Sequence, residues 1–398
     1  MVSYKRMNWG WPSEITVLYG PYGWTPEGAS TRRPIYLNGV GPMRRSALTL
    51  ALPLVLGACS MDPEPTAMHV DDPWSVPASW EVEERDLRFE SDGVQLAGTL
   101  HSPVGVEGGP ALVIVQQTNI LLRDFPLYAS LIETFNAIGY SVFVYDRRGH
   151  GESEGDPGFP GYMTLAEDAV AAKRAIGEED AVDAGKVGFW GISQGGWLAM
   201  EAAVIGDPAF VVSVAAPLTT PGEQMEYLAH NYVLAAGYGE EAAQRALEVR
   251  RLVAGEYYRG EISYDSARSV VEEVEEEPWF EHLQMSSADD LTENVEERPW
   301  IEEVDYDPVP AFKGVEAPML FIQGGEDIDV PVERTLEVAE EADSGEDVEV
   351  VVIPGANHGM RILEDPSQNV EPLNDQVPSY SIKYFMVMGE WLGRLGLA

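Results

Sequence analysis

The sequence predicts an α/β fold with a mostly parallel central sheet, flanking helices and a helical insertion. Short apolar runs alternate with stretches of helical spacing, which is typical of parallel strands joined by crossover helices. Residues 111–115 are apolar at every position, as expected for a strand buried on both faces. Between residues 218 and 305 this alternation stops and only helical spacing remains, which indicates an insertion.

The expected elements follow in chain order. Residues 82–89 and 94–101 predict two strands, and Ser91-Asp92-Gly93 between them is a hairpin signal. Apolar runs predict further strands at 141–145, 187–190, 210–215, 319–323 and 348–353. Helical spacing predicts helices at 128–138, 165–176, 194–205, 332–341 and 381–395, and in the insertion at 224–236, 240–253 and 264–275.

Composition limits the classes of partner. The chain has 398 residues, of which 45% are hydrophobic, so it can bury a large core. Its 67 acidic and 25 basic residues give a net charge of −42, which argues against a basic nucleic-acid surface. The acidic residues are spread along the chain, which indicates a solvated acidic surface, as in proteins that work in high salt. A surface charge that only keeps the protein soluble is the alternative.

The amino-terminal part predicts export. Residues 1–42 lack periodicity and are interpreted as an upstream extension or a start-site artefact. Residues 43–58 combine a basic start, a short apolar run and small residues, which indicates a signal peptide. The sequence Leu-Gly-Ala-Cys at 56–59 resembles a bacterial lipobox, and this resemblance implies acylation of Cys59, the single cysteine.

Residues 59–80 are rich in Pro and Asp and predict a tether. We therefore expect a membrane-anchored lipoprotein, in the periplasm or on the outer face of the cell envelope. The acyl chains would hold it there, because an acidic surface is repelled by anionic lipids. An uncleaved apolar segment with an incidental buried Cys59 is the alternative.

The motif that organises the chain is Gly191-Ile192-Ser193-Gln194-Gly195, which fits Gly-x-Ser-x-Gly. It lies between an apolar strand run and an Ala-rich helical stretch, the context in which this motif forms a nucleophile elbow. Ser193 is therefore the candidate nucleophile, and the flanking glycines permit close backbone packing. A glycine-rich turn with a solvated serine is the alternative.

A serine nucleophile needs a general base, and the base needs an orienting carboxylate. Among six histidines, His358 directly follows a late strand, in a loop whose turn residues can aim its imidazole over the sheet edge. The carboxylate should follow the strand at 319–323. Glu326, Asp327 and Asp329 all lie there, and their position at the strand end does not separate them.

The order Ser193, acid, His358 is similar to that of the α/β-hydrolase fold. The segment 324–331, Gly-x-x-Asp-x-x-Val-Pro, resembles the acid loop of that superfamily, which implies that Asp327 orients the histidine. The Gly-Gly pair at 195–196 and the loop Tyr-Asp-Arg-Arg-Gly at 145–149 look most like the esterase and prolyl-oligopeptidase-like branch. The resemblance implies a hydrolase core at 81–217 and 306–398, and a helical cap at 218–305.

The resemblance also implies an oxyanion hole formed by two backbone N–H groups. One belongs to Gln194, directly after the nucleophile. The other lies in the turn after residues 111–115, where this chain has Gln-Gln-Thr-Asn at 116–119 instead of a glycine-rich turn. This donor maps to Thr118, with Gln117 as the alternative. Backbone donors do not require glycine, so this departure is compatible with activity.

The predicted function is that of a carboxylesterase-like serine hydrolase that cleaves small-molecule esters through an acyl-enzyme on Ser193. Peptidases, aminopeptidases and thioesterases of the same fold are alternatives, and a catalytically silent binding lipoprotein is an alternative of another class. No cofactor is expected. No metal site is expected either, because the sequence has no His-Glu-x-x-His motif and no Cys/His cluster.

Aromatic residues of the predicted cap are candidates for an apolar substrate pocket. Trp279, Phe280 and Trp300 are the substrate-binding candidates, and Tyr227 and Tyr232 lie in the same region. Aromatic side chains at helical spacing can equally form the core of the cap itself.

Overall fold

The computed structural model describes residues 35–36, 81–118, 121–158, 160–293, 303–342, 347–363, 369 and 380–397. The predicted signal peptide, the lipobox with Cys59, the tether, and all but two residues of the upstream extension lie outside the described residues. Trp300 lies outside them as well.

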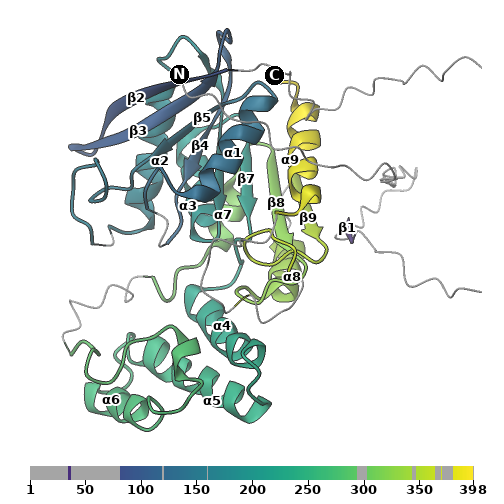
Figure 1. Cartoon of the computed structure of the whole chain (residues 1–398). Coiled ribbons are helices and arrows are strands. Elements are labelled where there is room, and N and C mark those ends of the chain that lie inside the picture. Colours follow the sequence, from purple (N-terminus) through teal and green to yellow (C-terminus); the bar gives the residue numbers. More distant parts are fainter. Residues whose placement is uncertain are drawn as a thin grey trace, which may run out of the picture.

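The described residues form one nine-stranded sheet with the order β1-β9-β8-β7-β6-β4-β5-β3-β2 (Figure 1). Strands β4 to β9 run parallel to one another, β3 is antiparallel to both β2 and β5, and the two-residue β1 pairs in parallel with β9. The strands are β1 (Ile35–Tyr36), β2 (Val82–Ser91), β3 (Val94–Pro103), β4 (Gly109–Val115), β5 (Ser141–Tyr145), β6 (Val182–Ile192), β7 (Val211–Val214), β8 (Met319–Gly324) and β9 (Val348–Ile353).

Helices cover both faces of the sheet (Figure 1). Helices α2, α3, α7 and α8 pack on one face, and α1 and α9 pack on the other. Their bounds are α1 (Pro126–Ala137), α2 (Tyr162–Ile176), α3 (Gln194–Gly206), α7 (Val309–Gly314), α8 (Val332–Ala342) and α9 (Ile382–Leu395). Helix α7 was not expected from the sequence, because it has only six residues and starts beside a proline.

The position of β4 between two layers of helices explains why its sequence is apolar at every residue. Val113 and Val115 belong to the core beneath α2 and α3, whereas Leu112 and Ile114 belong to the core beneath α1 and α9. Successive side chains of a strand point to opposite faces, so a strand covered on both sides needs apolar residues at every position.

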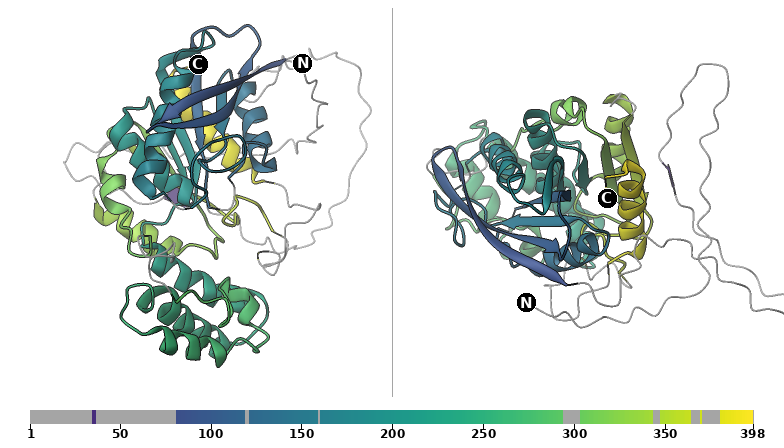
Figure 2. Two further views of the ribbon diagram at one scale, coloured as in Figure 1. Left: turned by 90° about the vertical axis from the view of Figure 1, so that its left-hand side faces the viewer. Right: turned by 90° about the horizontal axis from the view of Figure 1, so that it is seen from above.

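The predicted insertion is a helical unit between β7 and β8 that lies apart from the sheet (Figure 2). Its elements are α4 (Pro221–Ala235), α5 (Glu240–Arg250), the π-helical η1 (Arg251–Glu256), α6 (Tyr264–Glu272) and the 3₁₀-helical η2 (Phe280–Leu283). They enclose a separate apolar core. Helix α4 begins at a capping box in which Thr220 and Glu223 bond reciprocally to each other's backbone N–H.

This topology places the candidate side chains at one edge. The chain passes from β4 to β5 on one side and later to β6 on the other, so the sheet has a switch point beside β4. Ligands of open α/β sheets bind at such points, outside the carboxyl ends of the strands. Ser193, Asp327 and His358 follow the carboxyl ends of β6, β8 and β9, which share this edge because these strands are parallel.

Candidate active site

Ser193 occupies a strained turn between β6 and α3. Its backbone φ is 55° and ψ is −126°, and a non-glycine residue rarely adopts a positive φ. A Cβ on Gly191 would overlap the backbone of Gly195, and a Cβ on Gly195 would overlap the carbonyl oxygen of Val115. Both positions therefore require glycine, and the turn has the geometry of a nucleophile elbow.

Gln194 is the first residue of α3, and its backbone N–H belongs to the first turn, which the helix itself leaves unsatisfied. The positive end of the helix dipole lies at the same place and favours negative charge. The turn is held to the sheet because the Ser193 N–H donates to the Val214 carbonyl at 2.8 Å. This end of α3 can therefore bind an anionic oxygen.

Asp327 and His358 form a hydrogen-bonded pair. The His358 Nδ1 lies 2.9 Å from Asp327 Oδ2. The other oxygen, Oδ1, accepts the backbone N–H groups of Asp329 at 2.8 Å and Val330 at 3.1 Å. Asp327 is only 5% exposed, so this carboxylate is fixed on both of its oxygens. Among the three acids that the sequence left open at the strand end, Asp327 is the one that contacts the imidazole.

The charges around His358 favour its protonated form. Burial lowers the pKa of His358, but the carboxylates of Asp327 and Asp329 outweigh burial and raise the pKa to about 9. With Nδ1 bonded to Asp327, the nitrogen left for a substrate or for a serine hydroxyl is Nε2. Within the described part of the chain, the Ser193 hydroxyl forms no hydrogen bond with His358.

The turn after β4 lies against the nucleophile turn, because the backbone of Val115 and Gln116 surrounds the position of Gly195. Gln116 is buried, and its Nε2 has no hydrogen-bond partner among the described residues. Thr118 is exposed at the end of the described part of this turn. Its predicted role as the second oxyanion donor stays a prediction.

The charged side chains of the loop after β5 are bonded to neighbouring segments. Arg148 donates two hydrogen bonds to the fully buried Asp168, at 2.8 and 2.5 Å. Asp146 accepts the backbone N–H groups of Arg123 at 3.0 Å and Glu152 at 2.9 Å. The bonded loop fixes the backbone on which Arg147 approaches the nucleophile turn.

Residues 124–366 match the family model described as Serine aminopeptidase, S33, and the match covers more than half of the chain. The chain belongs to the serine aminopeptidase S33 family. An uncharacterized protein of Mycobacterium tuberculosis is 32% identical over 140 residues, which are 35% of this chain and 47% of that protein. Thiohydrolase aneE of Aspergillus aculeatus is 33% identical over 118 residues, 28% of this chain and 34% of that protein. The chain thus matches less than half of the length of these curated relatives.

Solved structures confirm the predicted α/β-hydrolase fold. DcsB in complex with a substrate analogue has a TM-score of 0.50 and 20% identity, covering 80% of this chain and 100% of that chain. The Pyrococcus furiosus esterase Pf2001 has a TM-score of 0.50 and 17% identity, covering 79% of this chain and 91% of that chain. At such low identity the likeness shows the fold alone.

The insertion of this S33 family member reaches the acid loop through a tyrosine of α4. Burial raises the pKa of the Tyr232 hydroxyl, and the neighbouring carboxylate of Asp329 raises it further. Burial raises the pKa of Asp329 to about 6, although His358 and the bond from Tyr232 act in the opposite direction. Sequence reasoning placed Tyr232 in the insertion but did not foresee this contact.

The predicted pocket aromatics lie elsewhere in the insertion. Trp279 is 6% exposed and belongs to the apolar core of the insertion, and Phe280 packs against that core. This placement matches the alternative given above, in which these rings form the core of the insertion itself. It leaves the ring of Trp279 little surface for a substrate.

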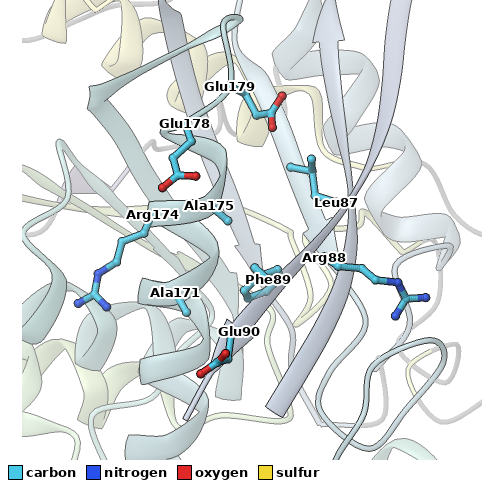
Figure 3. Close-up of a pocket in the computed structure, with 9 residues that line it drawn as sticks. All are labelled: Leu87, Arg88, Phe89, Glu90, Ala171, Arg174, Ala175, Glu178 and Glu179. Carbon is cyan, nitrogen blue, oxygen red and sulfur yellow. The ribbon is translucent and has the colours of Figure 1, made fainter. Parts of the chain in front are cut away.

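A groove between β2 and α2 contains none of the predicted site residues (Figure 3). Its apolar floor includes Phe89 and Ala175, and charged side chains such as Glu178 surround it. Among the described residues, no group of three or more acidic, histidine or cysteine side chains could hold a metal ion. In the same part of the chain, no helix combines the length and apolarity needed to cross a membrane.

Proposed function

We propose that the protein is a serine hydrolase that cleaves carboxylic esters through Ser193, His358 and Asp327. The observation that carries the proposal is the hydrogen bond between His358 Nδ1 and Asp327 at the sheet edge shared with Ser193. The strained turn at Ser193 and the membership of the S33 family support the same reading. Acid, base and nucleophile thus follow three parallel strands of one sheet, as in α/β-hydrolases.

In the proposed mechanism, the Ser193 hydroxyl attacks the ester carbonyl carbon and passes its proton to His358 Nε2. The N–H groups of Gln194 and Thr118 stabilise the tetrahedral oxyanion. The intermediate expels the alcohol, which takes the proton from the imidazolium, and an acyl-enzyme remains. A water molecule then attacks the acyl group, with His358 as base, and releases the acid and free Ser193.

The test is a hydrolysis screen with purified protein at low and at high salt. The substrates are p-nitrophenyl esters of increasing acyl length, acyl-CoA thioesters and aminoacyl p-nitroanilides. We expect ester turnover in the wild type and none in Ser193→Ala with an unchanged melting temperature. Ester turnover retained by folded Ser193→Ala would refute the assignment. A folded wild type that turns over no substrate would favour the catalytically silent binding protein.

Thioester hydrolysis is the second candidate, and one comparison favours it. The protein from Aspergillus aculeatus that shares 33% identity over 118 residues is a thiohydrolase by name. The same acyl-enzyme chemistry serves both substrate classes, because only the leaving group differs. A kcat/KM for acyl-CoA well above that for the matching p-nitrophenyl ester would identify the thioester as the preferred class.

Peptide hydrolysis follows from the name of the family, whose description is that of a serine aminopeptidase. The helical insertion would be the part that selects substrates, as a cap over the sheet edge. Tyr232 supports this role because it lies next to Asp329, beside the Asp327–His358 pair. In the screen, aminoacyl p-nitroanilides report this activity, and we expect them to react far more slowly than esters.

We also propose that the protein is exported and anchored through acylation of Cys59, which rests on the lipobox-like sequence. Metabolic labelling with radioactive palmitate in a bacterial host tests this proposal. We expect label in the full chain, partition into detergent, and loss of both in Cys59→Ser. Unlabelled, water-soluble wild-type protein would contradict it.

A further inference from the structure

Four buried polar side chains beside Ser193 form a chain of hydrogen bonds. Arg147 Nη1 donates to Gln194 Oε1 at 3.1 Å, and the side chain of Gln194 also lies beside the Tyr162 hydroxyl and lowers its pKa. The Tyr162 hydroxyl in turn donates to Glu303 Oε2 at 3.3 Å. None of the four residues is more than 7% exposed, so these bonds form away from water, where they are strongest.

Glu303 brings the helical insertion into this chain of bonds. It lies where the polypeptide returns from the insertion to the core, next to Val304, whose carbonyl accepts the N–H of Gly222 at 3.0 Å. Gly222 belongs to the first turn of α4, so the segment that enters the insertion is hydrogen-bonded to the segment that leaves it. Two residues further on, Asp305 accepts hydrogen bonds from Arg259 of the insertion. Glu303 thus lies where the insertion rejoins the core.

Aromatic packing fixes the position of Tyr162 independently of its hydroxyl. Its ring stacks on Tyr306 with a centroid distance of 4.2 Å and meets Trp197 edge-on at 6.0 Å. Tyr306 also donates to Glu201 of α3 at 2.7 Å. Because the ring is held by these neighbours, removal of the Tyr162 hydroxyl should break the bonds without displacing the ring.

The charge of Glu303 is balanced within the same cluster. Burial raises the pKa of Glu303 to about 7, while the bond from Tyr162 and the positive charge of Arg147 act to lower it. In return, Glu303 favours the charged form of Arg147, whose pKa burial lowers. The two ends of the chain of bonds therefore stabilise each other across Gln194 and Tyr162.

We infer that Glu303 is a positioning residue for the oxyanion-binding N–H of Gln194. It acts through Tyr162, which together with Arg147 holds the Gln194 side chain from both ends. Gln194 is the first residue of α3 and has no preceding helical turn to fix it, so the contacts of its amide group help to hold the direction of the N–H directly after Ser193. This inference rests on the proposed function, because it assigns the N–H to the oxyanion of an acyl transfer.

If Glu303 has this role, its loss should weaken stabilisation of the transition state and leave substrate binding nearly unchanged. Glu303→Ala removes the acceptor of Tyr162, and we expect kcat to fall roughly tenfold with KM changed less than about twofold. The Ki of a trifluoromethyl ketone, which mimics the tetrahedral intermediate, should rise by a similar factor. Glu303→Gln keeps an acceptor oxygen and should restore most of kcat and Ki.

Tyr162→Phe is the second variant, because it removes the hydroxyl that links Glu303 to Gln194 and keeps the stacked ring. We expect it to reproduce the loss in kcat and the rise in Ki even if Glu303→Ala folds poorly. Glu201→Ala is the matched control, since it removes the acceptor of the Tyr306 hydroxyl in the same aromatic cluster without touching Gln194. It should retain wild-type kcat and Ki. Melting temperatures show which variants are folded.

Wild-type kcat and Ki in folded Glu303→Ala or Tyr162→Phe would overturn the inference. An equal loss in Glu201→Ala would also overturn it, because the effect would then belong to the aromatic cluster as a whole. The proposed function fails separately, if folded Ser193→Ala still hydrolyses the ester. If Ser193→Ala is inactive and Tyr162→Phe has wild-type kcat and Ki, the role of Glu303 is refuted and the proposed serine hydrolase function is still supported.

Discussion

The ion pair between Arg148 and Asp168 gives the sharpest prediction about stability. Asp168 is fully buried and Arg148 is 8% exposed, with two hydrogen bonds between them at 2.8 and 2.5 Å. Arg148→Met keeps most of the side-chain volume and leaves the buried carboxylate of Asp168 without its positive partner. Leaving one charge of a buried pair without its partner costs about 3–5 kcal/mol. We therefore expect the melting temperature to fall by roughly 10 °C, since about 1 kcal/mol shifts a large domain by a few degrees.

The assay is thermal and urea unfolding followed by circular dichroism at neutral pH. The double variant Arg148→Met/Asp168→Leu removes both charges and should recover most of the lost stability. Arg334→Met is the control, because its bridges to Glu337 and Glu341 are exposed and contribute at most about 1 kcal/mol. The reasoning is refuted if Arg148→Met unfolds within about 1 kcal/mol of the wild type. It is also refuted if the double variant is as unstable as the single one.

Four further predictions concern the site. The pKa of His358, about 9, predicts that kcat/KM rises with pH through this value, because the base must lose its proton to act; a plateau reached by pH 7 would contradict this. Asp329→Asn removes one charge that raises this pKa, so the rise should move to lower pH while the plateau is kept. Asp327→Asn should instead lower the plateau by orders of magnitude, because it removes the orienting carboxylate. Gly195→Ala should abolish reaction of Ser193 with a fluorophosphonate probe, because its Cβ meets the Val115 carbonyl; wild-type labelling would show that the backbone can move away.

The parts of the fold that the sequence predicted are those with local signals. The apolar run at 111–115 requires burial on both faces, and the structure places its side chains alternately in two cores. The turn at Ser193 is equally local, since only glycine at 191 and 195 permits the close backbone contacts that the structure has. The helix predicted at 240–253 instead ends at Arg250 and continues as a π-helix, a change that the spacing of apolar residues does not reveal.

The network around Gln194 could not be predicted because its members meet only through tertiary contacts. Arg147, Tyr162 and Glu303 come from three separate segments of the chain. Glu303 belongs to an acidic stretch of a chain with 67 acidic residues, and nothing in its neighbours distinguishes a buried carboxylate from a solvated one. Trp279 was ambiguous for a related reason, since an aromatic residue suits a substrate pocket and an apolar core equally well.

The central claim is that Ser193 is a nucleophile activated by His358. Labelling with a fluorophosphonate probe, followed by mass spectrometry of the peptides, tests it most directly. The account predicts one labelled peptide that contains Ser193, no label in Ser193→Ala, and labelling slowed by orders of magnitude in His358→Ala. Modification of a different serine, or a folded wild-type protein that takes up no label, would contradict it.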